Sequence, residues 1–279
     1  MKKNMKIFNY VKGDMATSFG RKSLVTVTVL AVIMLIPVCG NISMLEKSGT
    51  LGSSSIGEYI LLLFMGAAPF DISSRYFPFP ITWIMACSVL LLVNVNYTDN
   101  IFSVFGSQFT VRSRSRKRLW GIKFISLVLG CIIQLAVFYL AAAVFASILG
   151  AELTLHVSAD FADIFFYDND PAALASMSGG DWARIMLLPA LTLLTCNVVQ
   201  SALRLFVKPA VSFIAVMCLL LVSLYFFSPL LIGSFAMFSR IAPLLADGLT
   251  VRQALISNGA VMAICYAVGA VRMSRTDFI

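Results

Sequence analysis

Charged residues are scarce in this chain of 279 residues: Asp, Glu, Lys and Arg make up 12% of it, against about 25% in soluble domains. Hydrophobic residues make up 59%, and the mean hydropathy is +0.91. Such a composition excludes a water-soluble globular fold, a disordered chain and a disulfide-framed secreted module. It indicates a membrane protein that crosses the bilayer several times.

Residues that carry catalysis or bind metals are scarce as well. The only histidine is His156. The zinc motif H-E-x-x-H is absent, and no two cysteines form a CxxC pair. The six cysteines lie in or beside apolar runs, as small hydrophobic residues do. The chain also lacks the phosphate-binding loop G-x-x-x-x-G-K-[ST]. We therefore expect no catalytic residue, metal site or bound cofactor in this chain. Any ATP that drives the protein would have to bind a separate chain.

Six segments are apolar and long enough to cross about 30 Å of hydrocarbon. They contain no Asp, Glu or Arg, and their only Lys is Lys123. Ionisable residues that would mark an ion-coupled pathway are thus absent from their centres. The predicted spans are 24–40, 79–97, 122–149, 185–203, 209–229 and 254–271.

A seventh apolar stretch, 59–70, would reach only about 18 Å as a helix. Counting it as a crossing would place the basic run 112–118 outside, against the positive-inside rule. We therefore predict an outer re-entrant segment over 56–70. With six spans, 16 of the 21 Lys and Arg but 3 of the 13 Asp and Glu lie inside. Both termini are then cytoplasmic, and the largest outer loop, 150–184, is acidic.

Residues 1–23 have a pattern of their own, in which apolar residues recur every three or four positions among lysines. This spacing predicts an amphipathic helix in the inner headgroup layer. A disordered basic tail is the alternative. The apolar residues are Met5, Phe8, Val11, Met15 and Phe19.

The cytoplasmic segment 98–111 begins with possible helix caps, including Thr98 and Asp99, and continues with aromatic residues. Exposed phenylalanines beside water suggest a docking surface. Basic residues then form one helical stripe leading into the third span. The alternative is that these residues only anchor the chain at the membrane interface. The candidate docking residues are Asp99, Phe102, Phe105, Gln108, Phe109, Arg112 and Arg116.

This stretch carries a resemblance. The order G-x-Q, then V-R-S-x-S-R-x-x-W-x-x-K, over 106–123, resembles permease subunits of type-2 ATP-binding-cassette exporters, in particular small six-span permeases of bacterial peptide-export and self-resistance systems. Residues 228–240, Gln200 before Pro209, and the terminal 275–279 agree with it. The chain departs from the pattern at Leu119-Trp120 and at 233–235, where two aromatics and Gly-Asn-Tyr are expected.

The resemblance implies six spans, a coupling helix between the second and third, and short outer re-entrant helices at 230–238. It also implies a pair of permeases, identical or homologous, working with two ATPase subunits that bind ATP and magnesium. Phe102 and Phe105 would fill a groove of the ATPase.

Polar residues inside the spans are the remaining candidates. They can line a substrate path between two permeases, or they can hydrogen-bond neighbouring helices. These residues are Gln134, Asn197, Gln200 and Ser201.

Together the sequence predicts an all-α, polytopic protein of the cytoplasmic membrane, with a single transmembrane domain over 24–279. Its expected function is that of a permease subunit, not an enzyme, that moves a peptide or amphipathic substrate. Its expected partners are ATPase subunits, a second permease and membrane lipids, without nucleic acid. One alternative is a non-transporting anchor or sensor subunit, and another is an intramembrane enzyme.

Overall fold

The computed structural model describes residues 2–70, 79–98, 116–165, 177–242, 244–245 and 247–275. Helices dominate this part of the chain, and no β-strand occurs in it. The α-helices are α1 (Lys2–Ser18), α2 (Arg21–Lys47), α3 (Ile56–Phe64), α4 (Ile81–Val93), α6 (Arg116–Ile148), α7 (Ala159–Phe165), α9 (Gly179–Leu203), α10 (Pro209–Tyr225) and α11 (Val251–Arg275); the 3-10 helices are η2 (Ile232–Ala236) and η3 (Phe238–Arg240).

Four helices are long and apolar enough to cross a membrane: α2, α6, α9 and α11. The predicted all-α class is therefore confirmed for the described residues, and these four helices are compatible with a membrane protein. Two further predicted spans, 79–97 and 209–229, fall on the shorter apolar helices α4 and α10, of 13 and 17 residues. Both are shorter than predicted, because α4 ends in a turn at Asn94 and α10 ends at Tyr225.

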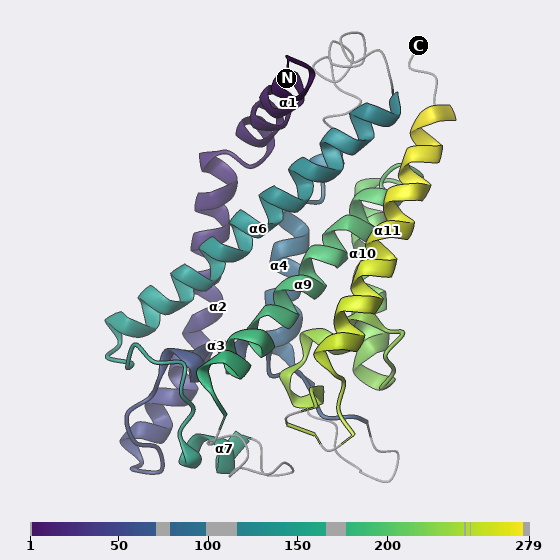
Figure 1. The fold of residues 1–279 in the computed structure, drawn as a ribbon. Coiled ribbons are helices and arrows are strands. Elements are labelled where there is room, and N and C mark those ends of the chain that lie inside the picture. The colour runs from purple at the N-terminus through teal and green to yellow at the C-terminus, as the bar shows by residue number, and fades with distance from the viewer. Residues whose placement is uncertain are drawn as a thin grey trace.

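The long helices run between two ends of an elongated bundle (Figure 1). At one end, here called the terminal end, α1 begins and α11 ends. At the opposite end, here called the α3 end, lie α3 and α7. The end of α4 and the start of α6 both lie at the terminal end, beside α1.

Helix α9 occupies the centre of the bundle, in contact with α4, α6, α10, α11 and η2. In its most apolar window 78% of the residues are buried, compared with 17% in α11. A helix surrounded by protein can carry polar residues that one facing lipid cannot. The polar residues of α9 are therefore positioned to contact other helices.

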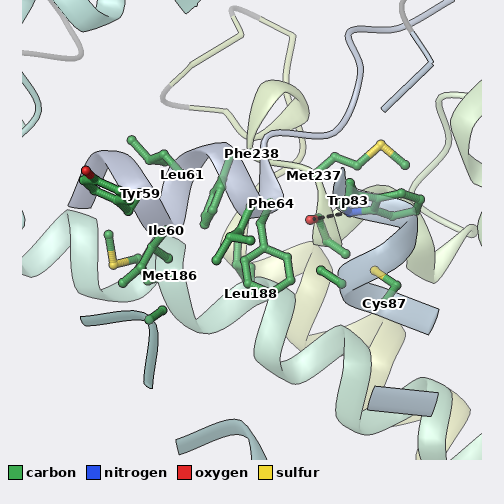
Figure 2. Close-up of a cluster of buried hydrophobic side chains, with 14 of the residues drawn as sticks. Tyr59, Ile60, Leu61, Phe64, Trp83, Cys87, Met186, Leu188, Met237 and Phe238 are labelled. Atoms are coloured by element: carbon green, nitrogen blue, oxygen red, sulfur yellow. Dashed lines mark hydrogen bonds between the residues drawn. The ribbon is translucent and has the colours of Figure 1, made fainter. Parts of the chain in front are cut away.

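Helix α3 fills the core at the α3 end, where the sequence predicts an outer re-entrant segment. Its side chains are almost all buried against α2, α4, α6 and α9. Figure 2 shows Phe64 of α3 beside Phe238, with Trp83 donating from Nε1 to the Ala236 carbonyl at 2.9 Å. The segment continues through Gly66, whose φ of +71° suits glycine and which leaves no room for a Cβ beside Met237.

Glycines also end two of the long helices. Gly49 after α2 and Gly150 after α6 have φ values of 72° and 93°. Thr50 N bonds to Leu45 O, and Ala151 N to Ala146 O, at 3.2 and 3.1 Å. These bonds form Schellman motifs that satisfy the last carbonyls of each helix.

The predicted outer loop 150–184 is shorter in the structure and partly helical. It contains α7, and α9 begins at Gly179, six residues before the predicted span. The Ser178 hydroxyl accepts a bond from Asp181 N at 3.3 Å and so caps α9. Helix α9 thus begins inside the segment assigned to the loop, because a helix can continue beyond the hydrocarbon with the charged residues Asp181 and Arg184 in its first turns. The position of the membrane boundary stays a prediction.

Candidate functional site

The predicted docking residues Asp99, Phe102, Phe105, Gln108, Phe109 and Arg112 lie outside the described residues, as does the side chain of Arg116. The residues immediately before them are described. Asn94 to Thr98 form the turn that follows α4 and leads into the predicted coupling segment. This turn, here called the α4 root, carries three side chains that bind neighbouring helices.

Asn94 binds two helices at once. Its Nδ2 donates to Gln134 Oε1 of α6 at 2.8 Å and to Asn197 Oδ1 of α9 at 2.9 Å. Gln134 Nε2 donates back to Asn94 Oδ1 at 3.1 Å and to Ser23 Oγ of α2 at 2.8 Å. All three amide side chains are buried. Four helices are thus joined by one cluster of amide groups.

Thr98 and Gln200 connect the same region to the end of α9. Gln200 Nε2 donates to the Leu91 carbonyl at 3.2 Å, and Thr98 Oγ1 donates to the Ser201 carbonyl at 3.4 Å. Gln200 and Ser201 are both buried. The predicted path residues Gln134 and Asn197 therefore meet through Asn94, whereas Gln200 and Ser201 contact the last turn of α4 and the α4 root.

The sequence left two roles open for Gln134, Asn197, Gln200 and Ser201: lining a substrate path or hydrogen-bonding neighbouring helices. Their contacts are those expected of the second role. Within a single chain none of the four residues is exposed. A role along a path between two permeases stays a prediction.

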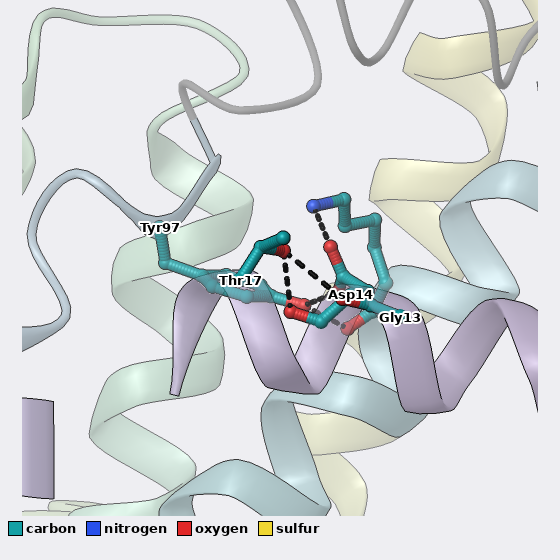
Figure 3. A network of polar contacts seen from close by, with 5 residues as sticks. Gly13, Asp14, Thr17 and Tyr97 are labelled. Carbon is teal, nitrogen blue, oxygen red and sulfur yellow. Dashed lines mark hydrogen bonds and ion pairs between the residues drawn. The ribbon is translucent and has the colours of Figure 1, made fainter. Parts of the chain in front are cut away.

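Tyr97, the third polar residue of the α4 root, lies beside a buried ion pair (Figure 3). Asp14 of α1 pairs with Lys123 of α6, and their side chains are 9% and 8% exposed. Tyr97 Oη contacts Asp14 Oδ2 at 2.7 Å and the Lys123 carbonyl at 2.9 Å. The Lys123 ammonium lies 4.9 Å from the centre of the Tyr97 ring. The α4 root is thereby joined to α1 and α6.

Packing reinforces the ion pair. The Phe19 ring lies 5.1 Å from the Tyr97 ring and fits against Gly130 of α6, where a Cβ would lie 2.4 Å from its carbon atoms. Glycine is required there to admit the ring. Val11 of α1 is buried as well, and Met15 is half-buried. The predicted position of α1 in the headgroup layer stays a prediction.

A second buried charge lies at the α3 end. Arg240 is fully buried, and its guanidinium donates to the carbonyls of Ala67, Ala68, Ser223 and Leu224. The last two carbonyls belong to the final turn of α10, where the helix dipole favours a cation. Burial lowers the pKa of Arg240 to about 10, so it stays charged at neutral pH. Arg240 therefore joins α10 to the segment after α3.

Glu58, a buried acid, is also held by neutral hydrogen-bond partners. Its carboxylate accepts from Ser55 N at 2.9 Å and from Ser158 N and Oγ at 2.8 and 2.7 Å. These bonds complete a capping box at the start of α3 and hold the residue that caps α7. Glu58 thus joins the start of α3 to the start of α7.

The described site connects helices through buried hydrogen bonds and an ion pair. In the described ranges no group of three or more His, Cys, Asp or Glu side chains could hold a metal ion. The buried cysteines Cys39, Cys87, Cys131 and Cys196 are free thiols.

Sequence analysis did not identify Asn94 or Asp14 as site residues. A weak signal existed for each: Asn94 interrupts an apolar run, and Asp14 is the single acid in the basic segment 1–23. Their partners lie 40 and 109 residues away in the chain. Pairing over such distances depends on helix packing and cannot be deduced from spacing.

Comparison with known proteins does not assign the chain to a family. No protein-family model, no curated protein and no solved structure matches this chain.

Proposed function

We propose that this protein is the membrane-spanning permease subunit of an ATP-driven exporter, with α2, α4, α6, α9, α10 and α11 as its six spans. It would receive work from a separate ATPase through residues 98–111. The substrate class that the resemblance suggests is a peptide or another amphipathic molecule. The proposal also places both termini in the cytoplasm.

The observation that carries the proposal is the α4 root. A segment that transmits force must be firmly connected to the helices it moves. Asn94, Tyr97 and Thr98 contact α1, α6 and α9 within five residues of chain. Motion of the following segment would therefore reach several helices together, rather than only α4.

Further support comes from the sequence of the segment itself. Phe102, Phe105 and Phe109 are followed by a basic run, which suits an interface with an aromatic core and a charged rim. The resemblance of 106–123 to type-2 exporter permeases points to the same role. The chain has no phosphate-binding loop of its own, so ATP that drives transport would bind a separate ATPase.

The test is purification of the tagged, full-length chain from its native membrane. We expect an ATPase of the ATP-binding-cassette type to copurify in stoichiometric amount, identified by mass spectrometry. Phe105→Ala should reduce its affinity about thirtyfold, since a central aromatic anchor commonly contributes about 2 kcal/mol. The permease itself should still insert and purify in normal yield.

Arg114→Gln is the matched control, because a single charge at the rim of an interface contributes little. Its copurification should remain close to that of the wild type. If Phe102→Ala/Phe105→Ala retained full assembly, the docking role would be wrong. If the wild type purified without an ATPase, a non-transporting anchor or sensor would be favoured.

A further inference from the structure

Helix α10 is followed by an exposed apolar turn at the α3 end. Residues 226–231, here called the aromatic turn, have the sequence FFSPLL, and the whole stretch 209–239 contains no Asp, Glu, Lys or Arg. Phe226 and Leu230 are 63% and 86% exposed, and Phe227 and Pro229 are exposed as well. Large apolar side chains are thus concentrated at the surface directly after the helix.

The end of α10 is satisfied by the protein itself. The last carbonyls of a helix have no donor within the helix and commonly bind water. Here the buried Arg240 donates to the carbonyls of Ser223 and Leu224. The Val222 carbonyl accepts from Phe226 N at 3.1 Å. These carbonyls therefore have partners without any contribution from solvent.

The backbone of the aromatic turn is bonded in the same way. Leu230 N donates to Ser228 Oγ at 3.3 Å, and Leu231 N donates to Ser228 O at 3.1 Å. Ser257 Oγ of α11 donates to the Pro229 carbonyl at 2.8 Å. Pro229 has no N–H group that would need a partner. Since unpaired backbone groups are unfavourable in hydrocarbon, these bonds suit a turn that leaves water.

The length of α10 indicates how deep the turn lies. Seventeen residues of helix reach about 26 Å, which is less than the hydrocarbon thickness of about 30 Å. The apolar turn follows directly and can supply the remaining depth. Leu153, which is 81% exposed at the same end of the bundle, lies instead between the exposed polar residues Glu152 and Thr154.

We propose that the aromatic turn inserts among the acyl chains of the leaflet at the α3 end, with Phe226, Phe227 and Leu230 in contact with lipid. The apolar side chains, the bonded backbone and the continuity with α10 all match an acyl environment. A soluble partner protein would match the side chains alone. The proposal rests on α10 being one of the six proposed spans, and it adds that lipid contact extends beyond the end of the helix.

The test is electron paramagnetic resonance of single nitroxide labels on the full-length chain without its native cysteines. The chain is reconstituted in vesicles of phosphatidylcholine and phosphatidylglycerol, with a nickel chelate on both sides of the membrane. Oxygen concentrates among acyl chains and the chelate stays in water, so their collision rates report depth. The label at Leu230→Cys should collide mainly with oxygen, and so should a label at Phe226→Cys in the same turn.

Leu153→Cys is the matched control, because it replaces an equally exposed leucine at the same end, and its label should collide mainly with the chelate. Ile214→Cys, within α10 and 57% exposed, is the standard for lipid contact. If the Ile214→Cys label met oxygen while the Leu230→Cys label met the chelate, the turn would lie in water and the proposal would be overturned.

Two other results are informative. Few collisions with either reagent at Leu230→Cys would show that protein covers the turn, which would also overturn lipid insertion. Collisions mainly with the chelate at Ile214→Cys would contradict α10 as a span. That result would reject the six-span proposal itself, and is distinct from a failure of the turn alone.

Discussion

At the scale of single residues, two buried cations are stabilised in different ways. Lys123 has a carboxylate partner in Asp14, whereas Arg240 has only backbone carbonyls. A buried charge without compensation is strongly destabilising. Each cation therefore fixes the elements that supply its partners: α1 in the first case, α10 and the segment after α3 in the second.

Removing one member of the Asp14–Lys123 pair should be more harmful than removing both. Asp14→Ala leaves a buried ammonium group and should lower the free energy of unfolding by about 3–5 kcal/mol. Asp14→Leu/Lys123→Met removes both charges and should lower it by much less. Denaturant unfolding in detergent measures both values. A double variant as unstable as the sum of its single variants would show that the two charges do not interact.

Substitution of Arg240 should destabilise the protein more than most substitutions at the α3 end. Arg240→Met removes the donors to four buried carbonyls and should lower the free energy of unfolding by at least about 3 kcal/mol. Arg184→Met is the control, because Arg184 is 72% exposed and pairs with Asp181 of the same helix. Its effect should not exceed about 1 kcal/mol. Similar midpoints for the two variants would contradict the role given to Arg240.

At the scale of elements, aromatic rings fit against glycines where helices cross. Phe19 fits against Gly130, which docks α1 on α6, and Trp120 fits against Gly269, which docks α6 on α11. Each glycine lets a ring reach the backbone of the neighbouring helix. The α4 root adds directional hydrogen bonds to this packing, and such bonds between membrane helices contribute about 0.6 kcal/mol each on average.

Gly130→Ala should loosen α1, because its Cβ would lie 2.4 Å from the Phe19 ring. We expect a loss of about 1–3 kcal/mol in stability and faster tryptic cleavage after Lys12. Phe19→Leu in the same chain should restore part of the loss. Gly259→Ala, on α11 with open space around it, is the control and should be neutral or slightly stabilising. Equal proteolysis of both variants would show that Gly130 does not determine the docking of α1.

Much of this architecture follows from the sequence. Apolar runs without charge predicted all six long or intermediate helices, because burying a charge in hydrocarbon is unfavourable for any arrangement of neighbours. The short helices at 56–64 and 232–240 also fall in the two segments expected to be re-entrant. Helix ends were less predictable: α9 extends to Gly179 because a serine cap and the charged residues after it are compatible with helix outside the bilayer.

The candidate site was predictable only in part. Gln134 and Asn197 were predicted as candidates because they are amides in apolar segments. Nothing in the neighbouring sequence indicates that both bind Asn94. Asp14 and Lys123 are each unusual in their surroundings, yet their pairing depends on how α1 packs against α6. Such contacts result from tertiary packing, which residue spacing does not encode.

At the scale of the whole molecule, the described charges separate along the bundle. Exposed cations of α1, α2, α6 and α11, and Lys208 just before α10, lie at the terminal end, and the described acids other than Asp14 lie at the α3 end. This separation is the pattern that the positive-inside rule requires of a protein whose terminal end is cytoplasmic. In that orientation the α4 root faces the compartment that contains ATP.

The central claim is that the connection between α4 and α6 is cytoplasmic while the segment before α7 lies outside. Single cysteines at Ser113 and Ser158, in a chain without the native cysteines, test it with a membrane-impermeant thiol reagent. We predict that intact cells label the Ser158→Cys variant, and that the Ser113→Cys variant is labelled only after the membrane is opened. Labelling of both variants from the same face would contradict the six-span topology and the coupling role that depends on it.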